Sequence, residues 1–136
     1  MRKLIILEIF ILLLMVSCQK GIDNNSFIID QTFGIKYGES KNNTDYGIII
    51  KLDSVLNDSR CPSDGICVWA GNAEVRFIYS KSKEQVSFVL NTLSSFRTDT
   101  LINGYRIKLI ALTPYPKIAG GIKRSDYKAD IEILKK

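Results

Sequence analysis

Apolar residues recur at every second position in six separate runs of this chain, and this spacing constrains the fold more than any other sequence feature. The runs cover residues 33–37, 48–53, 73–79, 86–90, 105–110 and 127–133. Alternate residues of a β-strand point to the same face, so each run predicts a strand with one face turned to a core. No stretch has the 3.6-residue apolar period of a helix. The pattern therefore indicates an all-β domain.

Turn-forming residues separate these runs, at residues 41–45 and 80–83, at Asn103-Gly104 and at Gly120-Gly121. Pro114 and Pro116 follow the fifth run, and because proline cannot donate to a strand ladder we expect the strand to end there. Six to eight short strands in residues 27–136 predict one small antiparallel β-sandwich or partly open barrel.

The N-terminus has the order of a secretory signal peptide. Arg2 and Lys3 precede an apolar stretch over residues 4–16, which small Ser17 separates from Cys18. This stretch is shorter than the ~20 apolar residues that a permanent membrane span needs. We therefore predict a signal helix over residues 1–17 that is cleaved, followed by a flexible polar tether over residues 18–26.

The tetrapeptide Met-Val-Ser-Cys at residues 15–18 resembles the lipobox of bacterial lipoproteins. This resemblance implies that Cys18 carries acyl chains and becomes the mature N-terminus. Gln19 follows in place of the aspartate that retains many lipoproteins at the inner membrane. The expected location is the bacterial cell envelope, lipid-anchored at the outer membrane and facing the periplasm or the cell surface. The alternative is a cysteine that happens to end an ordinary signal peptide.

Lipidation of Cys18 would leave Cys61 and Cys67 as a pair. In an oxidising compartment these two should form a disulfide, whose small ring would contribute about 2 kcal/mol in the chain-entropy description. Their spacing differs from the C-x-x-C of redox enzymes. Because the chain contains no histidine, a zinc site would need carboxylates to complete it.

The densest motif of the chain covers residues 58–75, DSRCPSDGICVWAGNAEV. It resembles the D-S-R-C-P…C-x-W-A-G-x-A-x-V pattern of uncharacterised small bacterial exported proteins and lipoproteins. The resemblance implies a small β domain and implies no activity.

Arg60, Asp64 and Trp69 are the candidate binding residues in this motif, since Trp and Arg are enriched at binding hot spots and a disulfide keeps a loop rigid. A structural interpretation competes with this one. In it, Arg60 pairs with Asp58 or Asp64 or donates to loop carbonyls, and Trp69 packs over the disulfide or caps one end of the core.

The composition excludes several functions. Without histidine, Ser-His-Asp and Cys-His catalysis are impossible. We predict no enzyme, no catalytic residue, no metal and no cofactor, and no recognition motif points to nucleic acid. The hypothesis is a non-catalytic binding module, anchored to the membrane by acyl chains, with a protein, peptide or glycan partner. Its alternative is a structural or stress-protective envelope lipoprotein without a specific ligand, and a protease inhibitor ranks third. The oligomeric state is left open.

The net charge of +5 is concentrated towards the C-terminus. From residue 105 onward, eight basic residues face three acidic ones. Such a region can attract anionic lipid headgroups or polyanions. The simpler interpretation is a solvated strand face and a charged tail.

Overall fold

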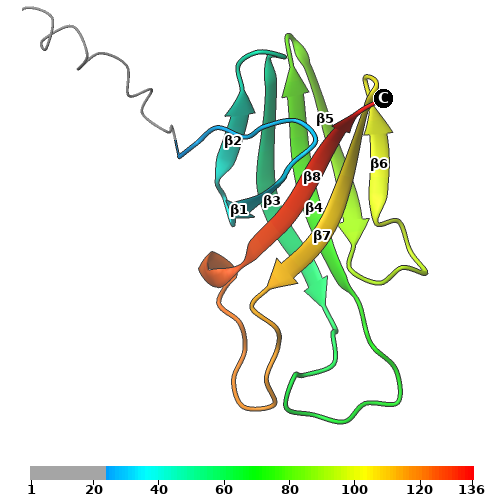
Figure 1. Cartoon of the computed structure of the whole chain (residues 1–136). Helices are drawn as coiled ribbons and strands as arrows, with labels where there is room; N and C mark the ends of the chain where they lie inside the picture. Colours follow the sequence, from blue (N-terminus) through cyan, green and yellow to red (C-terminus); the bar gives the residue numbers. More distant parts are fainter. Residues whose placement is uncertain (1–23) are drawn as a thin grey trace, which may run out of the picture.

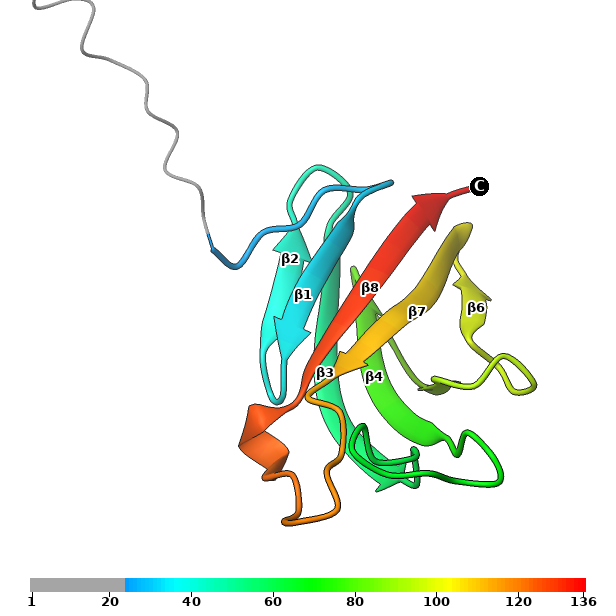
Figure 2. The same ribbon diagram turned by 60° about the horizontal axis from the view of Figure 1, so that its bottom comes forward.

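The computed structural model describes residues 24–136, which form two four-stranded antiparallel sheets packed face to face. One sheet has the order β1-β8-β7-β6 and the other β2-β3-β4-β5 (Figures 1 and 2). The strands are β1 (Thr32–Lys36), β2 (Ser40–Asn43), β3 (Ile48–Asp58), β4 (Ala73–Lys81), β5 (Glu84–Asn91), β6 (Asp99–Ile102), β7 (Tyr105–Thr113) and β8 (Lys128–Lys135). The predicted all-β fold is confirmed, and it is a sandwich because the two sheets do not close into a barrel.

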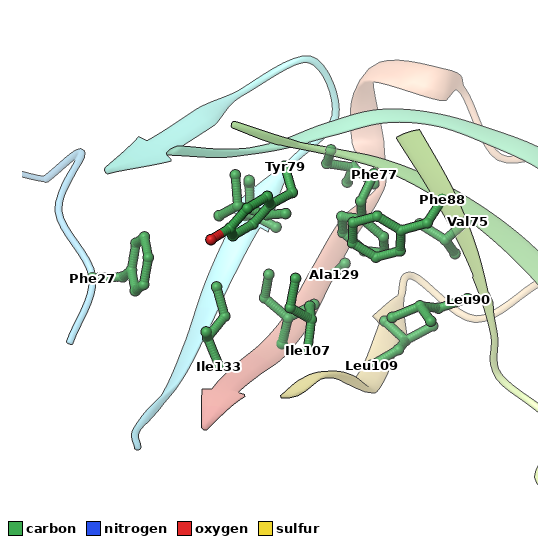
Figure 3. Close-up of a cluster of buried hydrophobic side chains, with 14 of the residues drawn as sticks. Phe27, Val75, Phe77, Tyr79, Phe88, Leu90, Ile107, Leu109, Ala129 and Ile133 are labelled. Atoms are coloured by element: carbon green, nitrogen blue, oxygen red, sulfur yellow. The ribbon is translucent and has the colours of Figure 1, made fainter. Parts of the chain in front are cut away.

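The hydrophobic core lies between the sheets and follows the alternation of the sequence. On β4, Val75, Phe77 and Tyr79 are completely buried, while the residues between them are only partly buried. Ile131 and Ile133 of β8, on the other sheet, belong to the same buried cluster (Figure 3 labels Ile133). The buried core residues of the described chain all lie between residues 27 and 133. Segment 24–136 therefore contains both sheets and the core between them.

Two strands, β2 and β6, have no apolar alternation and were missed by the sequence analysis. Residues 41–43, expected in a turn, belong to β2, whose sequence is Ser-Lys-Asn-Asn. Each of these strands has only four residues and pairs with one strand of its sheet. On its other side, β2 forms backbone hydrogen bonds with residues 25–27. Short polar edge strands are common because they discourage pairing with other chains.

A predicted turn and a predicted strand end are both confirmed. Asn103 and Gly104, with φ of 51° and 78°, form the two-residue turn between β6 and β7. Positive φ at both positions suits the right-handed twist of a hairpin, which explains the Asn-Gly pair. Strand β7 ends at Thr113, immediately before Pro114, as its sequence predicts.

The described chain begins at the opposite end of the sandwich from the β3–β4 loop. Residues 24–26, which the sequence assigns to the tether, lie along β2, where Ser26 forms a bridge with Asn42 and the Asn25 carbonyl accepts from the Asn42 amide. Asn42 pairs with Ile49 near the start of β3, whereas the β3–β4 loop leaves its far end at Asp58. The predicted signal helix and Cys18 lie outside the described residues.

Candidate functional site

Two long loops lie side by side at one end of the sandwich (Figures 1 and 2). Residues 59–72 connect β3 to β4, and residues 114–127 connect β7 to β8. The Ser63 amide donates to the Pro116 carbonyl at 2.9 Å, and the Ile118 amide donates to Asp64 Oδ1 at 2.9 Å. Segments about fifty residues apart in the sequence therefore support each other at this end.

The first loop is closed by the predicted disulfide, which is present between Cys61 and Cys67 with their Cα atoms 5.9 Å apart. Inside the ring, the Gly65 amide donates to the Pro62 carbonyl at 3.0 Å, which forms a turn. At its base, the Cys61 amide donates to the Ala70 carbonyl, also at 3.0 Å. These bonds and the disulfide fix the backbone path of the loop.

Gly71 allows the two ends of this loop to approach each other. Its φ is +68°, and a Cβ atom at this position would lie only 1.8 Å from the Ser59 carbonyl oxygen. At this position a residue with a side chain would be strained by the backbone conformation. Its Cβ atom would also collide with the backbone at the other end of the loop. The glycine of the Trp-Ala-Gly sequence is thus required by the close approach.

Arg60 lies inside the sandwich end, with only 4% of its surface exposed. Its Nε donates to Asp58 Oδ1 at 2.8 Å and its Nη2 to Asp58 Oδ2 at 2.6 Å. Its Nη2 also donates to the Pro114 carbonyl at 2.9 Å and its Nη1 donates to the Leu112 carbonyl at 2.5 Å. The guanidinium therefore joins the end of β3 to the end of β7, with Asp58 rather than Asp64 as its partner.

Two tyrosines complete the surroundings of this ion pair. The Tyr115 ring lies 4.5 Å from the Arg60 guanidinium carbon, in a cation–π contact. The Tyr127 hydroxyl donates to Asp58 Oδ2 at 3.0 Å. The geometry of the pair is thus set by four segments: the end of β3, the first loop, the start of the second loop and its last residue.

The ionisation of this cluster reflects burial and pairing. Burial of the Asp58 carboxyl opposes its ionisation, but the hydrogen bonds and charge of Arg60, with the Tyr127 hydroxyl, outweigh it and lower the pKa of Asp58. Burial of Tyr127, reinforced by the neighbouring Asp58 carboxylate, raises the pKa of its hydroxyl to about 12. At neutral pH the cluster therefore contains a carboxylate, a guanidinium and a neutral phenol.

The outer part of the first loop is exposed and apolar. All five side chains of residues 66–70, Ile-Cys-Val-Trp-Ala, are exposed, with Ile66 fully so, Val68 at 88% and Trp69 at 80%. The expectation that Trp69 covers the disulfide or the core is wrong. Ile118 of the second loop is 69% exposed and approaches Gly65. We call Ile66, Val68, Trp69 and Ile118 the tip.

The three candidate binding residues thus have different positions. Trp69 is on the surface, Arg60 is buried, and Asp64 is exposed but its Oδ1 accepts the Ile118 amide. Ile118 and Tyr115 were not among the predicted site residues, because the segment around them has no sequence signal other than its prolines and glycines. The available signal was the Pro-Tyr-Pro sequence, which holds a chain segment stiff.

Two small cavities flank Tyr115, each about 220 Å³. The first is lined by Lys117, Gly120, Ile122 and Asp126 among others, and the second by Arg60, Thr92, Ile110 and Leu112 among others. Sites for drug-sized ligands are usually about 300–1,000 Å³. The exposed tip, rather than either cavity, is therefore the candidate site for a large partner.

Within residues 24–136, no three His, Cys, Asp or Glu side chains are grouped so that they could hold a metal ion. In the same part of the chain, no helix has the length and hydrophobicity needed to cross a membrane. That the chain is not an enzyme stays a prediction.

Comparison with known proteins gives no relative: no protein-family model, no curated protein and no solved structure matches the chain. The motif resemblance therefore stays a prediction.

Proposed function

We propose that this chain is a lipid-anchored protein of the bacterial cell envelope that binds a partner, without catalysis, through the tip. The observation that carries the proposal is the run of five exposed apolar residues at 66–70. Soluble proteins expose single apolar residues routinely, but apolar residues gathered on one surface mark interaction sites.

The support beneath the tip favours binding. The disulfide, the Ser63–Pro116 hydrogen bond and the buried Arg60 hold the loop in one conformation. A rigid surface loses little conformational entropy when a partner binds, so more of the contact energy remains as affinity. A loop that served only to close the fold would gain nothing from displaying Trp69 to solvent.

The position of the tip suits an anchored binding protein. The described chain starts beside Asn42, and the tip follows Asp58 at the other end of β3. Nine strand steps separate Ile49 from Asp58, which corresponds to roughly 30 Å. With acyl chains on Cys18, the tip would project away from the point of attachment.

The test compares how much protein the envelope retains. Segment 24–136, which contains both sheets and the core between them, is produced oxidised and sedimented with envelope fragments from the source cells. We expect the double variant Ile66→Ser, Val68→Ser to be retained at least about tenfold less, since each apolar side chain buried contributes roughly 1.5–3 kcal/mol.

A matched double variant, Ile28→Ser with Leu101→Ser, removes two other exposed apolar side chains, 61% and 55% exposed. It should be retained like the unaltered segment. Equal retention of the tip variant and the unaltered segment would refute the proposal and favour the structural role without a ligand.

A further inference from the structure

The apolar side chains of the tip protrude from the molecule instead of lining a groove. Ile66, Val68 and Trp69 are 80% exposed or more, and no charged residue lies between residues 65 and 73. A protruding apolar surface needs a soft or a concave partner.

The second loop carries three cations in addition to Ile118 of the tip. Lys117, Lys123 and Arg124 are exposed, and within residues 24–136 none of them forms an ion pair. Lys117 directly precedes Ile118 of the tip. Arg124 begins the short helix η1 (Arg124–Asp126), which lies further from the end of the molecule than the loop itself (Figure 1).

Two carboxylates in this region reduce the positive charge without removing it. Asp64 accepts the Ile118 amide, and Asp126 accepts the Ser125 hydroxyl at 3.2 Å. Arg60 and Asp58 neutralise each other inside the sandwich. The exposed charges of the two loops therefore leave a cationic excess beside an uncharged tip.

An uncharged apolar tip with exposed cations on the same loop is complementary to a bilayer surface, where an apolar acyl region lies next to headgroups that can be anionic. Aliphatic side chains gain by leaving water for the acyl region, tryptophan favours the interface, and lysine and arginine are attracted by anionic headgroups. We propose that the tip inserts into the headgroup region of a bilayer that contains anionic lipids. The proposal rests on the proposed function and names the partner of the same surface.

A bilayer fits better than a protein pocket because it adapts to the shape of whatever enters it. A protein partner would need a pocket complementary to four side chains from two loops, and the charge around that pocket would have to be negative as well. A lipid surface that contains anionic lipids accommodates the apolar side chains and supplies the negative charge, and it needs no complementary shape. Because residues 24–26 lie at the opposite end of the sandwich, the tip would form a second lipid contact, separate from the acyl chains.

Trp69 is the single tryptophan of the chain, so its fluorescence reports on the tip alone. Oxidised segment 24–136, which lacks Cys18 and the signal peptide, is mixed with vesicles of phosphatidylethanolamine and phosphatidylglycerol. We expect Trp69 emission to shift to shorter wavelength and to be quenched by brominated acyl chains. Phosphatidylcholine vesicles should bind the segment at least about tenfold more weakly, because they lack the anionic charge.

Two variants separate the apolar and the ionic contributions. Ile66→Ser with Val68→Ser should reduce binding to the anionic vesicles at least about tenfold, and Lys117→Glu with Lys123→Glu should do so to a similar extent. The Ile28→Ser, Leu101→Ser control should bind as the unaltered segment does.

Unchanged Trp69 emission with the anionic vesicles would overturn the bilayer proposal. If envelope retention still depended on Ile66 and Val68 in that case, the partner would be a protein or a glycan and the proposed function would stand. If retention were also independent of them, both proposals would fail.

Discussion

The Asp58 carboxylate and the Arg60 guanidinium form a two-pronged ion pair inside the end of the sandwich, with their side chains only 8% and 2% exposed. The two residues are separated by a single position, where the chain leaves β3 and enters the first loop. Through the carbonyls of Leu112 and Pro114, the pair also fixes where the second loop begins. The exposed tip therefore stands on a buried ionic support.

Removal of Arg60 should destabilise the whole domain. Arg60→Ala leaves the Leu112 and Pro114 carbonyls without this donor and the buried Asp58 carboxylate without its counter-charge, so the free energy of unfolding should fall by about 3–5 kcal/mol. Urea unfolding measures this change. Arg76→Ala is the matched control, because Arg76 is 42% exposed and 3.9 Å from Asp53, and it should cost less than about 1 kcal/mol. Equal costs for the two variants would contradict the structural role of Arg60.

Tyr127 should make stability depend on alkaline pH. Its pKa is raised from 10.0 to about 12 in the folded chain, so its contribution to stability is complete below pH 10 and is lost as the pH rises through about 12. The loss should be roughly 2–3 kcal/mol. Urea unfolding from pH 9 to 12.5 should show a decline that is smaller in Tyr127→Phe, which keeps the part due to the raised pKa of buried Tyr79. The exposed Tyr115→Phe should follow the unaltered chain.

The disulfide should contribute both to the stability of the domain and to binding by the tip. Replacement of Cys61 and Cys67 together by serine should lower the free energy of unfolding by about 2 kcal/mol, because the open loop gains conformational freedom when the chain unfolds. Envelope retention, measured at a temperature where the variant is fully folded, should fall as well, since the tip loses its fixed conformation. Retention equal to that of the bridged form would show that the tip does not need the constraint.

The sequence predicts those parts of the fold that leave a local pattern. Each of the six alternating runs became a strand, and the disulfide follows from the two remaining cysteines. Strands β2 and β6 leave no such pattern, because short strands like these are held by backbone hydrogen bonds rather than by an apolar face.

The burial of the candidate site residues could not be predicted from the sequence, because it depends on contacts between distant segments. Arg60 is charged and Trp69 is aromatic, so ordinary preference places the arginine outside and the tryptophan inside. The observed positions are reversed. Arg60 is buried because carbonyls more than fifty residues away complete its hydrogen bonds, and no local pattern encodes that meeting. The motif lies in the loop that carries the exposed apolar residues, but its sequence does not show which side chains face solvent.

Gly71 should be the most sensitive glycine of the loop. In Gly71→Ala, the new methyl group meets the Ser59 carbonyl oxygen at 1.8 Å and the Arg60 Cα at 2.9 Å, so the chain must move where the buried ion pair is attached. We expect a loss of more than about 3 kcal/mol, together with weaker envelope retention. Gly38→Ala is the matched control, because Gly38 also has positive φ, +75°, but open space around it. Backbone strain alone should cost it about 1–2 kcal/mol. If both variants lose the same amount, the strain of positive φ explains the effect and the close approach of the loop ends does not.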